Sequence, residues 1–435
     1  MNFTTDYRLE NFILQTQWAD IPAPVQERLR GCMLDLLGAL VAGSGSGQFA
    51  AGLALARRAF RSGDIAVIGA ADTFDFLGAS AAMGHASNAY DIDDGHNIIR
   101  AHPGTSFIGG LLAAGYECDL NAQDFLAALY VSYETTIRMG EAIMDYYQYA
   151  HSSGTFGAVG VAAGAGRIYG LDRAALNNIL SIAEFNAPLV PGIRSVEYPS
   201  MNKDGVPFGV MIGALALLAD QCGFTGNKHL LEADEYRRYL DDLGQNHEVM
   251  ALYFKPYPCC RWGHPAIDAC LALMAEHHVT AQDIKSVTVE TFYKATQLSK
   301  GCLLYTYNIA YPVAAAIVNN GFSIQQVENT NDDAVIDMMG RLSFVCDPEL
   351  DAQFPARRLC RAAMVLKDGR RIVSDVHEPR GEACENIGYD WLADKFHRIT
   401  AHRLTSPQQE VFIQRLHNDD WTVRQLISQV NAALL

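Results

Sequence analysis

The densest group of side chains able to transfer protons lies between residues 90 and 104. It comprises three carboxylates, two histidines and an arginine: Asp91, Asp93, Asp94, His96, His102 and Arg100. Burying one face of such a segment without partners would be costly, so polar residues between two apolar helices often have a function. A capped, solvated turn with salt bridges fits the spacing equally well. A metal site with Asp and His ligands has less support, because no paired-histidine ligand spacing occurs.

Two further polar segments precede apolar runs. His151 is followed by Ser-Ser-Gly-Thr155, and a helix starting there would present backbone N–H groups to a carboxylate. A histidine in this position also serves as a simple helix cap. Lys203 stands at the rim of a strongly apolar helix, where it either reaches solvent or meets an anion.

A fourth segment places three potential cations, Lys255, Arg261 and His264, around two prolines and two adjacent cysteines. The prolines fix the backbone path, so a rigid linker between domains is an alternative to a binding site. Cys259 and Cys260 could provide a nucleophile. The sequence places no base beside them, and buried cysteines are usually unreactive.

A fifth segment contains alternating tyrosines at Tyr305, Tyr307 and Tyr311, a pattern more typical of packing. The chain lacks the glycine-rich dinucleotide motif, the P-loop and the G-x-S-x-G nucleophile motif. Acidic, basic and cationic groups without such a motif indicate proton transfer at carbon, or cleavage of a C–O or C–C bond by side chains alone.

The elements that must position these groups are mostly helices. Apolar periodicity predicts helices over 25–41, 78–90, 108–117, 122–144, 156–170, 173–185, 205–222 and 265–277. Alternating β-branched residues predict strands at 284–292 and 342–345, and Asp368-Gly369 predicts a hairpin joining 359–366 to 371–376. From residue 389 onward the pattern is helical again.

We therefore predict a mainly α fold. A large all-helical domain is built from both chain ends, residues 1–252 and 391–435, and an α+β domain is inserted at 253–390. A length of 435 residues favours two domains, and 49% hydrophobic with 19% charged residues supports a large core.

The net charge of −16 argues against nucleic acid as the main partner, although a local pocket can still bind an anionic substrate. The N-terminus lacks a basic stretch followed by an apolar run, and no apolar run is long enough to span a bilayer. The ten cysteines include no C-x-x-C pair, so free thiols in a cytoplasmic protein, without structural zinc, are expected.

The order of these segments resembles the MmgE/PrpD family. The similarity rests on motifs spread over nearly the whole chain: Leu34-Asp-Leu-Leu-Gly38, Gly84-His-Ala-Ser-Asn-Ala-Tyr-Asp-Ile-Asp-Asp94, His102-Pro103, His151-x-x-Gly-Thr-Phe-Gly157, Lys203, Lys255-Pro-Tyr-Pro-Cys-Cys-Arg261, His264-Pro-Ala-Ile-Asp268 and Glu378-Pro-Arg-Gly381. The family includes 2-methylcitrate dehydratase, cis-aconitate decarboxylase and iminodisuccinate epimerase.

The resemblance implies a homodimer in which the α+β domain acts as a lid over a site without metal or organic cofactor. Residues that match the family's catalytic positions are Asp91, His102, His151, Lys203, His264 and Tyr311. We expect substrate contacts from His96, Arg100, Thr155, Lys255 and Arg261.

Several positions differ from the family pattern. Gly95 replaces a frequent Thr, Met83 a usual Asn, and Asn308 a usual Ser, while His96 and Arg100 add polar groups to the signature loop. These differences surround the expected pocket, so they bear on the substrate and on the reaction type.

The resulting hypothesis is a cofactor-independent lyase acting at a carbon next to a carboxylate of a small di- or tricarboxylic acid. It would be a dehydratase or decarboxylase of a compound like 2-methylcitrate or aconitate. One alternative is an epimerase of an amino- or iminodicarboxylate such as iminodisuccinate. A second is a binding protein that kept the fold without the chemistry.

Overall fold

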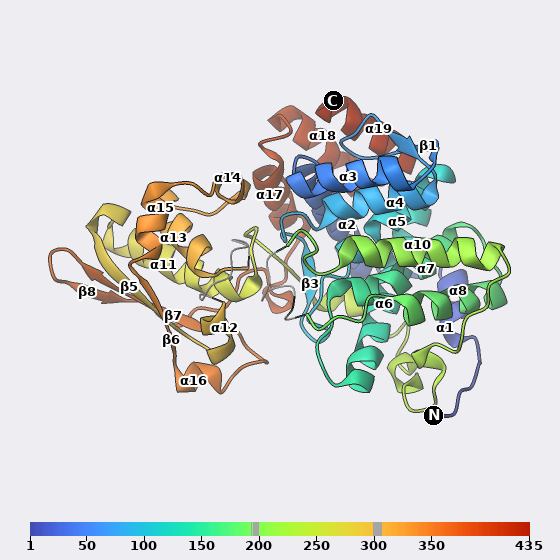
Figure 1. Cartoon of the computed structure of the whole chain (residues 1–435), viewed down its shortest axis with the longest axis horizontal. Helices are drawn as coiled ribbons and strands as arrows, with labels where there is room; N and C mark the ends of the chain where they lie inside the picture. The colour runs from blue at the N-terminus through green and yellow to red at the C-terminus, as the bar shows by residue number, and fades with distance from the viewer. Residues whose placement is uncertain (193, 195–199, 299–306) are drawn as a thin grey trace.

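The computed structural model describes residues 1–192, 194, 200–298 and 307–435, and it contains a large helical part and a smaller α+β part (Figure 1). One apolar core joins side chains between Leu9 and Phe254 to side chains between Ile387 and Val430. A second core runs from Tyr257 to Ile372. Both chain ends thus build the helical part, and the predicted mainly α fold is confirmed.

The helical part contains α1 (Arg8–Gln15), α2 (Ala23–Gly43), α3 (Gly47–Ala59), α4 (Phe76–Ser87), α5 (Thr105–Glu117), α6 (Ala122–Tyr147), α7 (Ser153–Ile168), α8 (Arg173–Asn186), α10 (Val206–Gln221), α17 (Tyr389–Thr400), α18 (Ser406–His417) and α19 (Val423–Leu434). It also holds two small antiparallel pairs that the sequence did not predict: β1 (Ser62–Ala66) with β2 (Thr73–Phe74), and β3 (Asp94–His96) with β4 (Leu252–Phe254). No single described helix is both long and apolar enough to cross a membrane. Among the described helices, only α2 and α3 taken together have the length and composition of a membrane span, and an 82° bend separates them.

Close packing of α7 on α10 aligns the starts of these two helices. A Cβ on Gly209 would lie 2.2 Å from the carbonyl oxygen of Gly154, so the two backbones meet where no side chain fits. The N–H of Gly154 donates to the carbonyl of Asp204 (2.9 Å). The turn before α10, which carries Lys203 and Asp204, is therefore held against the start of α7.

The α+β part contains a four-stranded sheet in the order β6–β5–β7–β8. Its strands are β5 (Ile284–Thr291), β6 (Leu342–Cys346), β7 (Cys360–Leu366) and β8 (Arg371–Val373), with β5 and β6 parallel and the other pairs antiparallel. These strands confirm the predicted ones, and Gly369 takes a φ of 93° in the predicted hairpin turn. The helices are α11 (His264–His277), α12 (Tyr293–Gln297), α13 (Ala310–Asn319), α14 (Ile324–Glu328), α15 (Asp333–Met339) and α16 (Pro348–Asp351).

Helix α17, near the end of the chain, packs against α2 (Figure 1), and a buried ion pair joins the two helices. Lys395 Nζ lies 2.5 Å from Asp35 Oδ1 and donates to the carbonyl of Ile92 at 2.5 Å. Burial raises the pKa of Asp35 to about 6, although Lys395 acts in the opposite direction. Lys395 therefore ties the returning C-terminal segment to the loop that follows α4.

Replacing Lys395 should show how much this ion pair contributes to the stability of the fold. Lys395→Met leaves Asp35 buried without its cation, so we expect the free energy of unfolding to fall by about 3–5 kcal/mol in urea denaturation. Adding Asp35→Leu removes the uncompensated charge and should recover most of the loss. A double variant as unstable as the single one would show that the pair is not the source of the stability.

Candidate active site

The loop that connects α4 to β3 buries three carboxylates. Asp91, Asp93 and Asp94 are each at most 1% exposed, and Asp91 adopts a φ of 54°, in the left-handed region that Asp tolerates better than most residues. Strand β3 pairs with β4, which is followed directly by Lys255. The loop is thereby fixed beside the junction of the helical and α+β parts.

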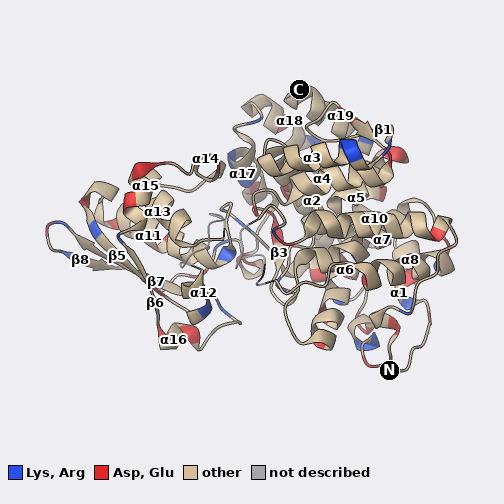
Figure 2. Ribbon diagram, viewed as in Figure 1, with Lys and Arg blue, Asp and Glu red and all other residues tan. Residues whose placement is uncertain are grey.

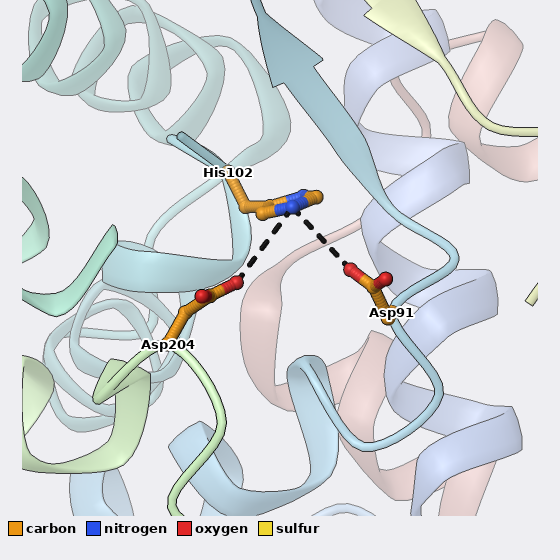
Figure 3. Close-up of side chains that lie close together, drawn as sticks. All are labelled: Asp91, His102 and Asp204. Atoms are coloured by element: carbon orange, nitrogen blue, oxygen red, sulfur yellow. Dashed lines mark ion pairs between the residues drawn. The ribbon is translucent and has the colours of Figure 1, made fainter. Parts of the chain in front are cut away.

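His102 contacts carboxylates through both ring nitrogens. Its Nδ1 lies 3.1 Å from Asp93 Oδ2 and 2.9 Å from the carbonyl oxygen of Asp94. Its Nε2 lies 3.3 Å from Asp91 Oδ1 and 3.8 Å from Asp204 Oδ2, with the ring between the two carboxylates (Figure 3). Carboxylate and carbonyl oxygens only accept hydrogen bonds, so this environment suits a ring with a proton on each nitrogen.

The surrounding charges keep His102 protonated. Burial and the charge of Lys255 both favour the neutral ring and lower the pKa of His102. The charges of Asp93 and Asp91 outweigh these effects, so the pKa of His102 lies well above its usual value. Burial alone would raise the pKa of Asp93, yet His102 lowers it below the usual range. The Thr105 hydroxyl also donates to Asp93 Oδ2 (2.7 Å). The surroundings of His102 therefore favour its imidazolium form.

Two buried lysines complete the charge balance. Lys255 Nζ lies 2.5 Å from Asp91 Oδ1, and although burial opposes it, Asp91 and Asp93 raise the pKa of Lys255. Lys203 donates to the carbonyl of Ala89, and burial lowers the pKa of Lys203 to about 8. Figure 2 shows the same mixture of acidic and basic residues around β3, where the two parts of the molecule meet.

Asp94 has partners of its own. The Tyr133 hydroxyl donates to Asp94 Oδ2, and the Gly104 N–H donates to Oδ1 (3.1 Å). Burial, followed by the charge of Asp93, raises the pKa of Asp94 to about 7. Asp94 can thus take up a proton near neutral pH.

The other two predicted catalytic histidines are neutral and lie in different surroundings. His151 packs against aromatic rings, with the Tyr149 ring centroid at 4.0 Å, and burial lowers the pKa of His151 to about 4. Neither of its ring nitrogens has a hydrogen-bond partner among the described residues. His264 Nε2 lies 3.1 Å from the carbonyl of Cys259, and burial together with Lys255 holds the pKa of His264 well below its usual value.

Tyr311 and Thr155 bond to backbone carbonyls. The Tyr311 hydroxyl donates to the carbonyl of Gln326 (2.5 Å) within the α+β part. The Thr155 hydroxyl donates to the carbonyl of Pro188 (2.6 Å). The described residues show no hydrogen bond from either side chain to the His102 cluster. The roles of Tyr311 and Thr155 toward substrate stay predictions.

The remaining predicted binding residues spread along β3 and its surroundings. His96 is buried, with Nε2 3.5 Å from Glu248 Oε2. Arg100 is exposed and takes a φ of 53°. Arg261 pairs with Glu382 and donates to Asn97 Oδ1 (2.5 Å), and burial lowers the pKa of Arg261 to about 10.

Three residues of the cluster were not assigned from the sequence. Asp93 belongs to the polar segment at residues 90–104, but its position in the sequence alone did not distinguish its role from that of Asp91. Asp204 directly follows Lys203. An acidic residue beside a lysine, just before an apolar helix, is a pattern that could have identified Asp204 from the sequence. Tyr307, whose hydroxyl donates to Asp204 Oδ2 (3.0 Å), had no signal apart from the tyrosine alternation. Tyr305 lies outside the described residues.

Acceptor atoms of three side chains come close together in this cluster. Those of Asp91, His102 and Asp204 lie within 4.8 Å of one another. Lys255 Nζ lies 2.5 Å from Asp91 Oδ1, so the charge of Asp91 is met by a side chain of the protein itself. The cysteines are unsuited to nucleophilic attack, because burial raises the pKa of Cys260 to about 12 and that of Cys259 well above its usual range.

Comparison with known proteins yields two matching family models. Residues 7–242 match the MmgE/PrpD N-terminal domain, and residues 257–419 match the MmgE/PrpD C-terminal domain. No curated protein matches the chain significantly. The first model covers Asp91, His102 and Asp204, whereas the second begins just after Lys255.

The protonation of His102 predicts a pH-dependent contribution to stability. A pKa raised by folding stabilises the protein fully below the unfolded value of about 6.5, and this contribution disappears as the pH rises through the folded value. The free energy of unfolding lost in His102→Gln should therefore be largest below the unfolded value of the pKa and shrink as the pH rises above it. Urea denaturation across this range measures it, with the exposed His417→Gln as control. A loss that stays constant or grows with pH would contradict a charged His102.

Proposed function

Because the chain belongs to the MmgE/PrpD family, we propose that it is a cofactor-independent lyase that transfers a proton at a carbon next to a carboxylate. The substrate class is a small di- or tricarboxylic acid, with a 2-methylcitrate- or aconitate-like compound as the model. The observation that carries the proposal is the placement of His102 Nε2 between Asp91 and Asp204, beside two buried lysines.

The lysines suit the intermediate of such a reaction. Removing a proton next to a carboxylate places negative charge on the carboxylate oxygens of an enediolate. Lys203 and Lys255 supply positive charge at the same buried site, where low water content strengthens their effect. Lys255 Nζ contacts Asp91, and Lys203 donates to the carbonyl of Ala89, so both cations lie beside the loop that carries Asp91.

His102 and Asp91 suit the two proton transfers. His102 serves as the acid, because the surrounding carboxylates keep a proton on Nε2 at neutral pH. Asp91 Oδ1, 3.3 Å from the same nitrogen, serves as the base that takes the proton from carbon. In a dehydration, the C–H electrons form the double bond and the β-hydroxyl leaves as water with the His102 proton. In a decarboxylation, carbon dioxide leaves and His102 protonates the resulting carbanion.

An epimerase acting on an amino- or iminodicarboxylate is the second candidate, and Asp204 favours it. A further carboxylate in a pocket for polyanions is unfavourable unless the substrate brings a cation or an N–H donor toward it. Asp204 lies 3.8 Å from His102 Nε2, within reach of such a group.

Proton NMR in D₂O tests the proposal and separates the candidates. Purified protein is incubated with citrate, 2-methylcitrate, cis-aconitate and iminodisuccinate. We expect deuterium exchange next to a carboxylate together with an unsaturated or decarboxylated product. Exchange with inversion at carbon and no other product would support the epimerase instead. No change with any of the four compounds would count against the lyase.

Loss of Lys203 or His151 should abolish most turnover without unfolding the protein. We expect Lys203→Ala and His151→Ala each to lower kcat by about 10²–10⁴-fold, while the far-ultraviolet circular dichroism stays unchanged. The exposed Lys285→Ala is the matched control for Lys203 and should retain wild-type turnover. Near-normal turnover of Lys203→Ala would remove Lys203 from the mechanism. Near-normal turnover of His151→Ala would contradict the prediction that His151, which lies outside the His102 cluster, takes part in the reaction.

A further inference from the structure

The two carboxylates that flank His102 Nε2 each receive a donor from beyond β4, on the side of the α+β part. Asp91 Oδ1 contacts Lys255 Nζ at 2.5 Å, and Asp204 Oδ2 accepts from the Tyr307 hydroxyl at 3.0 Å. His102 and both carboxylates belong to the helical part. The surroundings of Nε2 are therefore completed by residues from a different part of the chain.

The distances show where each carboxylate is bound. N–H···O hydrogen bonds usually span about 2.7–3.2 Å. His102 Nε2 lies beyond this range from both oxygens, at 3.3 Å from Asp91 and 3.8 Å from Asp204. On the opposite side of the ring, Nδ1 is within 3.1 Å of its two acceptors. The ring is thus anchored through Nδ1, whereas the proton on Nε2 is bound tightly by neither neighbour.

We propose that Tyr307 is a positioning residue, which holds Asp204 away from His102 so that the Nε2 proton remains available to the substrate. The role rests on the proposed function, because it assigns His102 the acid step. Tyr307 is itself buried, and its hydroxyl reaches Asp204 from the α+β part. A buried carboxylate without a donor is costly, so an Asp204 that lost this hydroxyl would be drawn toward His102, whose Nε2 lies 3.8 Å away.

The direction in which the pKa of His102 would change follows from the charged groups that face its ring. These are Asp91 and Asp93 from the loop before β3, Asp204 from the turn before α10, and Lys255 after β4. A tighter ion pair with Asp204 would stabilise the imidazolium and raise the pKa of His102 further. Removing the charge of Asp204 would lower it. The two changes therefore have opposite signs, which general loosening of the fold would not produce.

Histidine-selective NMR of the full-length protein tests the proposal without any substrate. The ring signal of His102 is identified by its absence in His102→Gln and is titrated in each variant. We expect Tyr307→Phe to raise the pKa of His102, Asp204→Asn to lower it, and the double variant to match Asp204→Asn. The control is Tyr169→Phe, which removes a tyrosine–carboxylate bond to Glu117 on the surface and should leave the titration unchanged.

Kinetics provide the second readout once an active substrate is found. Tyr307→Phe should lower kcat by about tenfold with little change in KM, less than the roughly 10²–10⁴-fold effect of a group that transfers the proton itself. The pH profile of kcat should shift in the direction of the NMR titration. A Tyr307→Phe variant whose His102 titration matches the wild type would overturn the proposal. A shifted titration in a protein inactive on all four compounds would leave the positioning intact and count against the lyase alone.

Discussion

Ionised carboxylates in a protein interior require positive charge beside them, and this constraint organises the centre of the molecule. Asp91 and Asp93 are almost fully buried, and Lys255 and His102 lie within ion-pair distance of them. The same constraint operates behind the loop, where Lys395 compensates Asp35. The Lys255–Asp91 and Lys395–Asp35 pairs connect segments distant in sequence, so charge neutralisation fixes the loop between α4 and β3 from several sides.

This arrangement explains why both chain ends and the inserted part are needed for one site. Helices α7 and α10 bring the turn with Asp204 to His102, and their contact depends on glycine at positions where a Cβ would overlap backbone. Lys255 and Tyr307 arrive from beyond β4. A motion of the α+β part relative to the helical part would change the donors of both carboxylates, which links the geometry of the site to the contact between the two parts.

The sequence predicted most of the long helices, the strands β5 to β8 and their hairpin, because each depends on local periodicity or on a turn glycine such as Gly369. It missed α3, α13 and the short pairs β1–β2 and β3–β4. It also predicted the polar segment with Asp91 and His102, since such a segment between apolar helices is recognisable without a fold. It did not predict Asp204 or Tyr307, because their importance arises from contacts across more than a hundred residues. Charge states were equally out of reach, since they depend on burial.

The central claim is that His102 carries a proton on both ring nitrogens at neutral pH, held there by the carboxylates around it. A joint neutron and X-ray crystal structure of the deuterated protein measures this directly, because neutrons locate deuterium. We predict nuclear density for deuterium on both Nδ1 and Nε2, with Nδ1 directed at Asp93 and the carbonyl of Asp94. Density on a single nitrogen would show a neutral ring and contradict the acid role assigned to His102.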